Sequence, residues 1–567
     1  MSGRAAAGGI DEMPDQGAEA LGRGATFTAK ADDATALYYN VAGLARQRGT
    51  KLQITANNHF NTMTFQRAGE YADDSTDPLT PWGGRKYPLV EDKNKSFTLP
   101  MLVASSDFGV FDRLTFGLGV FGPAATGRTF QLGVNGLPSP SRYDAVQSKS
   151  LLLFPTLGAA YRVTDQLDIG VSAFLAVADV NQMAIAYADS GGGACKNPEY
   201  RPCDAEGRFT GKGTSAGAAL GAMFRVNEAI QLGLQVRSPV SININGSTTA
   251  KIGASKEFGE PTTAGTTLDL PWVVRLGGRY VTMEKTEAEK RELWDVELNL
   301  TYETWGSAQD PGPQVKTADP LGTGDVTTIQ SLHKWNDTFG VRVGGAYNYA
   351  LDARDDAAAE NILVFRAGAF FDSSATEPKY TRLDSNTLPK IAGTAGLGFK
   401  HGPWSINLAY AAVASLPRTV TDGELRPNNG AKGGDNVDGD GNLLPPVNNG
   451  DYAAFSHVLA IGVEVNFERF FRDRKPTFGD PEYENLAGDV RAPKPKEKET
   501  TNEDEDADAD SPPPVKAKPK PKSKEEVEPP GTWWKPRVSD EQLKPYQEED
   551  DEEEEPPPKP APRRPRR

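Results

Sequence analysis

The sequence predicts an all-β fold, a transmembrane outer-membrane β-barrel of about fourteen antiparallel strands followed by a disordered tail. Three observations carry this prediction. Apolar and polar residues alternate repeatedly with period two between residues 51 and 467, the connections alternate between short and long, and charged side chains gather on one face of the strands. They divide the chain into an N-terminal segment at 1–50, a barrel at 51–470 and a tail at 471–567.

The alternation is clearest between residues 294 and 302. Every even position there is large and apolar: Trp294, Val296, Leu298, Leu300 and Tyr302. Every odd position is polar: Asp295, Glu297, Asn299 and Thr301. A similar pattern recurs at residues 114–120, 167–177, 230–236, 268–276, 404–410 and 457–467. Such segments are typical of strands with one apolar face.

The connections indicate which kind of sheet these strands form. Short links fall near residues 108–113, 163–166, 226–228, 351–360 and 401–403, and we place the link at 283–291 with them. Long links fall near residues 61–94, 122–148, 186–211, 245–266, 308–334, 372–388 and 415–452. Short periplasmic turns alternating with long extracellular loops are typical of an outer-membrane barrel. An even strand number then places both chain ends, and the tail, in the periplasm.

Charged residues on the polar face support a barrel with a polar lumen. Arg275, Arg342, Arg366, Asp295, Glu297 and Glu303 all lie opposite the apolar face. A charge facing lipid would cost about 2–4 kcal/mol at the bilayer midplane, so these side chains should point inward. The solvated outer face of a soluble sheet is the alternative interpretation.

Composition excludes several other classes. No run of about 18 apolar residues occurs, so we expect no transmembrane helix. Met1–Ala5 contains no apolar signal core, so for an exported chain we expect the signal peptide to be missing from this sequence. The four histidines show no metal-ligand spacing and no Ser/His/acid set stands out, so we expect no enzyme. Residues 475–567 are rich in Pro, Lys, Glu and Asp, which predicts disorder.

The segment before the first strand resembles a known family. It reads Gly17-Ala18-Glu19-Ala20-Leu21-Gly22, then Ala31-Asp32-Asp33-Ala34, then Asn40-Val41-Ala42-Gly43. This order is similar to the N-terminal hatch of the FadL family of outer-membrane hydrocarbon transporters, which includes TodX-type members. Val41 stands where the family's Asn-Pro-Ala-Gly motif has proline. The resemblance covers about residues 8–467.

The resemblance implies a mechanism. A fourteen-stranded barrel would be plugged by the hatch. For gating, the hatch should lie against the inward aromatic face beside Gly122-Pro123, with Asn40, Val41 and Ala42 nearest to that face. A hydrophobic ligand would be caught among the extracellular loops and pass into a lumen pocket. Hatch movement would open a path, and the ligand would leave sideways at a kinked third strand. We therefore expect transport of hydrophobic small molecules, either long-chain fatty acids or hydrocarbons.

The third predicted strand, residues 114–121, runs directly into Gly122-Pro123. Proline cannot donate to the ladder and glycine weakens it, so pairing should fail there and open a lateral gap. The alternative is that Gly122-Pro123 simply ends the strand.

Several inward positions are apolar, against the usual polar lumen: Phe121, Leu152, Phe154 and Phe174. They predict either a pocket for an apolar ligand or a surface that packs against the hatch. In the family's fatty-acid transporters a basic pair binds the carboxylate, and those positions fall near Ala184 and Asn336 here. Lys334, Arg342 and Arg366 are candidate substitutes, so the choice between a fatty acid and a neutral hydrocarbon stays open.

Two loop features complete the predicted sites. Cys195 and Cys203 lie in one long loop, and in an oxidising compartment we expect a disulfide between them. Asn436, Asp438 and Asp440 carry side-chain oxygens at every second position, and a glycine follows. This pattern suits a turn around Ca²⁺. A calcium loop of the EF type would also need a bidentate acidic ligand at its end, and that position is Val447 here. A plain flexible loop is therefore the alternative. We expect no other cofactor.

The expected partners are hydrophobic small molecules, outer-membrane lipid and lipopolysaccharide, with no nucleic acid, and the expected state is a monomer. An alternative function is a structural barrel whose tail binds the cell wall or a periplasmic protein.

Overall fold

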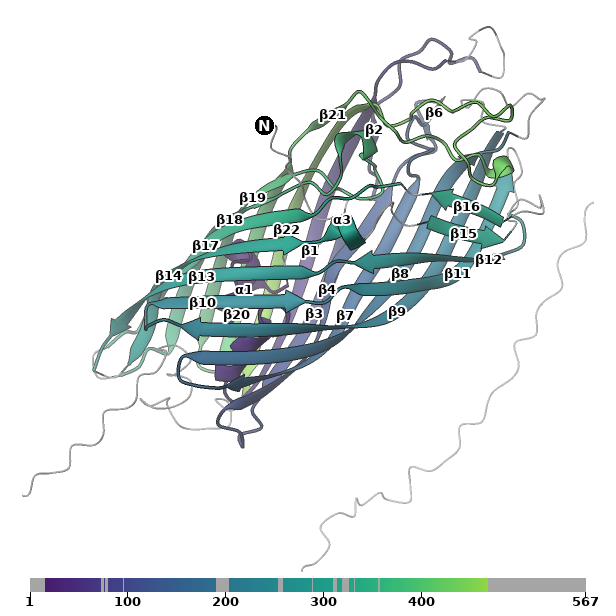
Figure 1. Ribbon diagram of the computed structural model, residues 1–567. Helices are drawn as coiled ribbons and strands as arrows, with labels where there is room; N and C mark the ends of the chain where they lie inside the picture. Colours follow the sequence, from purple (N-terminus) through teal and green to yellow (C-terminus); the bar gives the residue numbers. More distant parts are fainter. Residues whose placement is uncertain are drawn as a thin grey trace, which may run out of the picture. The chain divides into compact units, whose positions relative to one another are not determined.

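The computed structural model describes residues 16–467, except 73–75, 77–79, 95, 190–202, 253–257, 288, 309–313, 319–325, 331 and 355–356. Within these residues the chain forms a closed antiparallel barrel of fourteen wall strands (Figure 1). β22 pairs with β1 from Lys51↔Asn466 to Arg67↔Gly450, which closes the wall. The predicted tail lies outside the described residues.

Twelve wall strands are continuous in the described residues: β1 (Thr50–Arg67), β3 (Ser96–Ser106), β4 (Leu114–Thr129), β7 (Gln147–Arg162), β8 (Leu167–Tyr187), β9 (Asp204–Arg225), β14 (Lys290–Glu303), β17 (Thr338–Ala350), β18 (Asn361–Asp372), β19 (Lys390–His401), β20 (Trp404–Ser415) and β22 (Gly450–Asn466). The other two are interrupted near prolines, as β10 (Ile230–Arg237) with β11 (Val240–Ile252) and β12 (Thr262–Leu270) with β13 (Val273–Lys285). Pro239 and Pro271 lack the N–H that a continuous ladder needs.

Smaller elements lie in the connections. β2 (Val90–Glu91) pairs with β1, and β21 (Arg418–Val420) pairs with β22. β5 (Gly133–Val134) and β6 (Leu137–Pro138) form a hairpin, as do β15 (Gln314–Ala318) and β16 (Val326–Gln330). The described parts of the loops also contain three single turns: α3 (Trp305–Ala308), η3 (Pro378–Tyr380) and η4 (Gly430–Lys432).

The alternation of short turns and long loops is confirmed, but several strands extend further than predicted. β8 continues to Tyr187, β9 begins at Asp204 and β11 continues to Ile252, so two predicted long loops are shorter. The extra segments lack an apolar outer face. Asp179 and Lys212, for example, form an outward ion pair with side chains that are 51% and 79% exposed. Backbone pairing continues beyond the apolar band, where the alternation that marks a strand disappears.

The predicted faces of β14 are confirmed. Its even positions, Trp294 to Tyr302, are 39–51% exposed, whereas Asp295, Glu297 and Asn299 are at most 4% exposed. Trp294 and Tyr302 lie about 26 Å apart along the tilted strand, on the scale of the apolar band of an outer-membrane barrel. Among the described residues, no helix is long and apolar enough to cross a membrane.

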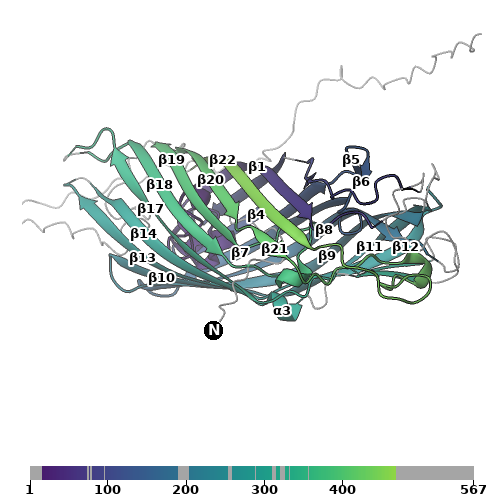
Figure 2. The same cartoon turned by 90° about the horizontal axis from the view of Figure 1, so that it is seen from above.

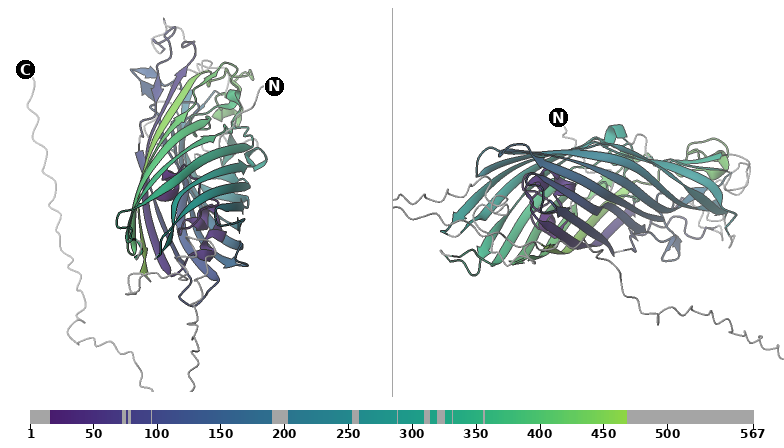
Figure 3. Two further views of the ribbon diagram at one scale, coloured as in Figure 1. Left: turned by 90° about the vertical axis from the view of Figure 1, so that its left-hand side faces the viewer. Right: turned by 90° about the horizontal axis from the view of Figure 1, so that it is seen from below.

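The N-terminal hatch, here residues 16–49, lies inside the barrel. It contains α1 (Ala18–Gly22), α2 (Ala36–Tyr39) and the turn η1 (Val41–Arg46), which the strands enclose in Figures 2 and 3. Wall glycines let the hatch backbone approach closely. A Cβ on Gly344 would lie 2.0 Å from the Arg23 carbonyl oxygen, and one on Gly170 would lie 2.7 Å from the Ala42 nitrogen.

Candidate functional site

The wall has an unpaired stretch between β3 and β4. Their pairing runs from Ser106↔Phe116 to Leu102↔Val120 and then stops. Both strands nevertheless continue, β3 against β1 as far as Ser96 and β4 against β7 as far as Thr129. We call the stretch between residues 96–101 and 121–128 the seam.

The seam is bounded at both ends. At the short-turn end it begins after the Leu102↔Val120 pair. At the long-loop end the Lys93 N–H donates to the Thr129 carbonyl at 2.8 Å, and the Thr129 N–H donates to Asp92 Oδ1 at 2.9 Å. Leu151, which pairs with Ala125 beside the seam, is 37% exposed on the outer surface. Leu102 and Val120, the last pair before the seam, are also exposed, at 48% and 37%, so the seam begins within the apolar outer band. It ends near the edge of that band, because Leu151 pairs with the exposed Asp179 of β8.

Prolines on both strands explain why the pairing stops. Continuing the observed β3–β4 register would place Pro100 opposite Gly122 and Leu99 opposite Pro123. Neither proline has an N–H to donate. β3 still pairs with β1 at Ala56↔Pro100, which indicates that the missing donor faces β4. The register of β4 on β7 also shifts between Phe121 and Ala124.

The structure therefore corrects the alternative in which Gly122-Pro123 ends the strand. β4 continues through this pair to Thr129, and the break in pairing lies on the side of β3. Pairing with β7 resumes at Ala124↔Leu152 because only the two bulged residues are skipped.

A side chain of the hatch forms hydrogen bonds with the backbone groups of β4 at the seam. Gln16 Nε2 donates to the Gly122 carbonyl at 3.0 Å, and the Gly122 N–H donates to Gln16 Oε1 at 3.2 Å. Gln16 is only 1% exposed. Its carboxamide thus occupies the hydrogen-bonding position that Pro100 cannot fill.

The four apolar lumen residues come together, as the inward parity predicted. Phe121, Leu152, Phe154 and Phe174 are each at most 7% exposed and belong to one apolar cluster, which we call the aromatic patch. The rings of Phe154 and Phe174 lie 4.6 Å apart. The hatch side chain Tyr38 packs on Phe121 at 5.3 Å, so in this structure the patch is covered by the hatch.

The hatch motif lies elsewhere than expected. Asn40 donates to the carbonyls of Thr28 and Ala222, at 2.8 and 3.1 Å, and its Oδ1 accepts from the Ala42 N–H at 3.3 Å. Val41 and Ala42 lie against Gly170 and Gly221 of β8 and β9. Tyr38 is therefore the hatch residue that packs on Phe121, and Asn40, Val41 and Ala42 fix the turn that follows it.

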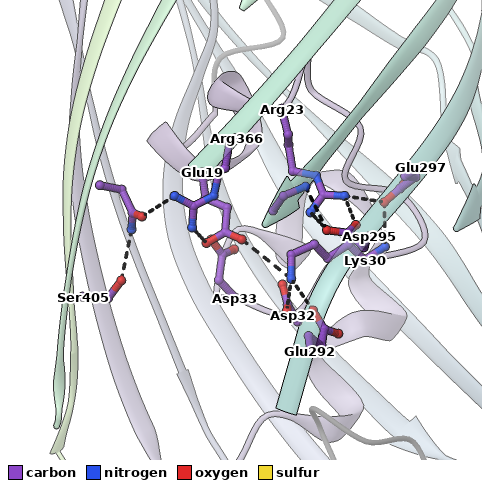
Figure 4. A network of polar contacts seen from close by, with 12 residues as sticks. Glu19, Arg23, Lys30, Asp32, Asp33, Glu292, Asp295, Glu297, Arg366 and Ser405 are labelled. Carbon is purple, nitrogen blue, oxygen red and sulfur yellow. Dashed lines mark hydrogen bonds and ion pairs between the residues drawn. The ribbon is translucent and has the colours of Figure 1, made fainter. Parts of the chain in front are cut away.

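Both candidate arginines are engaged with other protein groups. Arg366 contacts Glu19 Oε2 of the hatch at 2.7 Å and Asn407 Oδ1 at 2.9 Å (Figure 4). Arg342 pairs with Asp372 at 2.8 Å. Its Nη1 is buried without a hydrogen-bond partner, and Arg342 borders a cavity of about 30 Å³ with Tyr38 and Arg275.

The same network holds the hatch to the wall (Figure 4). Arg23 pairs with Asp295 and lies 3.7 Å from Glu297. Glu297 Oε1 also accepts the N–H groups of Thr28 and Ala29, both at 2.8 Å. These groups are almost completely buried, where breaking an ion pair by removing one partner costs about 3–5 kcal/mol.

A second cavity lies beneath the long loops. Its volume is about 90 Å³, and its largely apolar wall includes Met183, Ala184 and Ile185. Asp144 and Arg382 form its polar end and pair at 3.1 Å. Burial raises the pKa of the Asp144 carboxyl to about 6, although the neighbouring Arg382 guanidinium acts in the opposite direction.

The two loop predictions remain predictions. Cys203 is buried and disulfide-bonded, whereas Cys195 lies outside the described residues. Asp438 Oδ1 accepts the N–H groups of Asp440 and Asn442, and Asn436 donates to the carbonyl of Arg426. Within the described residues, no group of three or more His, Cys, Asp or Glu side chains could hold a metal.

Sequence reasoning missed Gln16, Tyr38 and Pro100. Pro100 carried a usable signal, because a proline inside a predicted strand marks an edge or a break in pairing. Gln16 and Tyr38 carried none, since their partners lie far away in the sequence.

Comparison with known proteins identifies the family. Residues 1–421 match the model of the outer membrane protein transport protein family (OMPP1/FadL/TodX). No curated protein sequence matches the chain.

Among solved structures, the fold is similar to a Pseudomonas aeruginosa FadL homologue, with TM-score 0.62 and 16% identity over 81% of this chain and 100% of that chain. It is similar to the Pseudomonas putida toluene transporter TodX, with TM-score 0.55 and 16% identity over 80% and 98%. It is also similar to the Ralstonia pickettii toluene transporter TbuX, with TM-score 0.53 and 13% identity over 79% and 98%. The chain therefore belongs to the OMPP1/FadL/TodX family of outer-membrane transporters of hydrophobic compounds.

Proposed function

We propose that this chain takes up a hydrophobic molecule through its extracellular loops and releases it sideways into the outer membrane through the seam. The cavity at Met183 and Ile185 would receive the molecule, and the aromatic patch would bind it in the lumen. The seam is the observation that carries the proposal. It lies beside Phe121 on the inside and near exposed Leu151 on the outside.

The free-energy cost of leaving wall backbone groups unpaired supports a functional role for the seam. Each backbone group without a partner in the hydrocarbon region costs several kcal/mol, so membrane barrels normally pair every one. Here Pro100, Gly122 and Pro123 prevent pairing between two wall strands, each of which stays paired on its other side. A ligand leaving at this place would need to disturb few wall hydrogen bonds.

The contacts of Arg342 and Arg366 favour a neutral substrate over a fatty acid, although Arg237 and Arg275 lie over the rings of Phe154 and Tyr38. Arg366 is bound by Glu19 and Asn407, and Arg342 is bound by Asp372. The free nitrogen of Arg342 faces a cavity of about 30 Å³, comparable to the volume of one water molecule in the liquid. Ala184 and Asn336, where the resemblance predicted basic side chains, are uncharged. The toluene transporters TodX and TbuX, which share the fold, agree with a neutral aromatic substrate.

Competitive uptake tests this proposal. A host lacking its own transporters of this family would express the full chain and receive labelled toluene or labelled oleate. We expect toluene uptake well above that of the empty host, with little competition from unlabelled oleate. Preferential uptake of oleate would contradict the neutral substrate, and uptake of neither would contradict hydrophobic transport by this chain.

A further inference from the structure

We propose that the Gln16 side chain is the latch of the seam and that the rest of the hatch stays in place during transport. This inference rests on the proposed lateral exit, and it names the group that must move. The latch is the pair of hydrogen bonds between the Gln16 carboxamide and the Gly122 backbone.

The chemistry of the latch suits this role. A carboxamide offers one carbonyl oxygen and two N–H groups, so it can both donate to and accept from one residue of a strand edge. Gln16 does this at Gly122, at 3.0 and 3.2 Å. It thereby replaces the backbone partner that Pro100 cannot provide. Unlike a strand, a single side chain can leave by rotating about its own bonds.

The hatch residues that follow Gln16 are held in place by the wall. Gln16 joins α1 through Gly17, whose φ of 106° is a conformation that glycine adopts readily and other residues rarely do. Directly after this glycine, the hatch is bound to the wall by Glu19 to Arg366 and by Arg23 to Asp295. Close backbone contacts at Gly344 then leave the Arg23 segment no space to shift.

The latch lies next to the proposed binding surface. Gly122 directly follows Phe121, the member of the aromatic patch on which Tyr38 packs. A ligand that displaces Tyr38 from Phe121 would therefore reach the residue that the latch holds. The peptide bond between Phe121 and Gly122 would therefore couple ligand binding at Phe121 to release of the Gln16 hydrogen bonds at Gly122.

Labelling of a buried lumen position tests the latch. Ala124 faces the lumen beside the seam and is 4% exposed, so Ala124→Cys should react with bilayer-dissolved N-dodecylmaleimide only when the seam opens. The reaction would be measured in full-length protein in outer-membrane vesicles, with and without toluene. Ala178→Cys is the control position, because Ala178 is 2% exposed and lies on β8, separated from Ala124 by Leu152 of β7.

The variants are Gln16→Leu, which removes both hydrogen bonds, and Gln16→Glu, which keeps the shape but removes the donor. Loss of two net hydrogen bonds, at about 1 kcal/mol each, should raise labelling at Ala124→Cys without toluene about thirtyfold. Toluene should raise labelling in the parent protein and add little in Gln16→Leu. Gln47→Leu is the control variant, since Gln47 accepts from Ser105 at 2.9 Å away from the seam, and it should leave labelling within about twofold.

The results distinguish the latch from the lateral route. Equal labelling of the parent and both Gln16 variants would overturn the latch, even where closing the seam abolishes uptake. Labelling that toluene never changes, together with normal uptake through a closed seam, would overturn the lateral route itself. Increased labelling at Ala178→Cys as well would mean that Gln16 holds the whole hatch rather than the seam.

Discussion

Closing the seam by mutation should stop transport while leaving the barrel folded. The triple variant Pro100→Thr, Gly122→Val, Pro123→Thr gives every residue on both sides of the seam a backbone N–H. Space is available for the new side chain, because a Cβ on Gly122 would meet Leu99 and Leu153 at 3.5 and 3.7 Å, which are ordinary contacts. Changing Gly122 and Pro123 alone would leave Pro100 without a donor, so we expect that double variant to close the seam only in part.

The size of the effect follows from the register. Continuing the β3–β4 pairing would add six residue pairs, from Met101 opposite Phe121 to Ser96 opposite Thr126. With about one hydrogen bond per pair and a net value of about 1 kcal/mol each, closure gains roughly 6 kcal/mol. About 2 kcal/mol of this is offset by the two bonds of the displaced Gln16. A remaining 4 kcal/mol would make the open seam about a thousandfold rarer.

The assay is toluene uptake in a host that lacks other transporters of this family. Uptake by the triple variant should fall to the level of the empty host, while the double variant should retain part of it. Pro271→Thr is the matched control, since it restores an N–H at the break between β12 and β13 and leaves the seam unchanged. Normal uptake by a triple variant that is folded and present in the outer membrane would refute lateral exit.

Three further outcomes are expected. Gly344→Ala places a Cβ against the Arg23 carbonyl and should cost about 1–3 kcal/mol in urea unfolding, whereas Gly393→Ala, with nothing within 4 Å, should cost little. Arg342→Gln should leave toluene uptake within about twofold, and a large loss would instead indicate recognition of a polar group. Because the pKa of Asp144 rises from 3.8 to about 6 on folding, the folded loops hold its proton more tightly, so their stability should fall as the pH rises from about 4 to 6. Proteolysis of the loops should then be slower at about pH 4 than at about pH 7, and Asp144→Asn should remove that difference.

The sequence predicted the features that depend on local pattern. Alternation at residues 294–302 assigned both faces of β14 correctly, since outward apolar and inward charged side chains repeat within one strand. It also placed Phe121, Phe154 and Phe174 on the same inner surface. Strand ends were less accurate, because above the apolar band the outer face of β8 and β9 is polar, as at Asp179 and Lys212. Buried apolar residues such as Val180 and Ile185 face inward there, so the outward apolar pattern that marks a membrane strand is absent.

The parts of the site that were missed depend on partners far apart in the chain. Gly122-Pro123 was recognised as a weak point, but the side on which pairing fails is set by Pro100, through a register that the linear sequence does not show. Gln16 and Gly122 are 106 positions apart. Likewise Arg366 seemed a candidate for the ligand because its partner, Glu19, is on the hatch and meets it only after the barrel closes.

The distribution of interactions decides which part of this barrel opens first. Structural units open locally in order of their free-energy cost, and a unit with few buried polar contacts opens before one with many. Releasing the hatch would break the buried pairs of Arg23 and Arg366 together with the Glu297 contacts to Thr28 and Ala29. Opening the seam breaks the two hydrogen bonds of Gln16 and separates the side chains packed there. A ligand with only apolar contacts has little binding energy to supply, so the wall should open at the seam while the hatch remains in place.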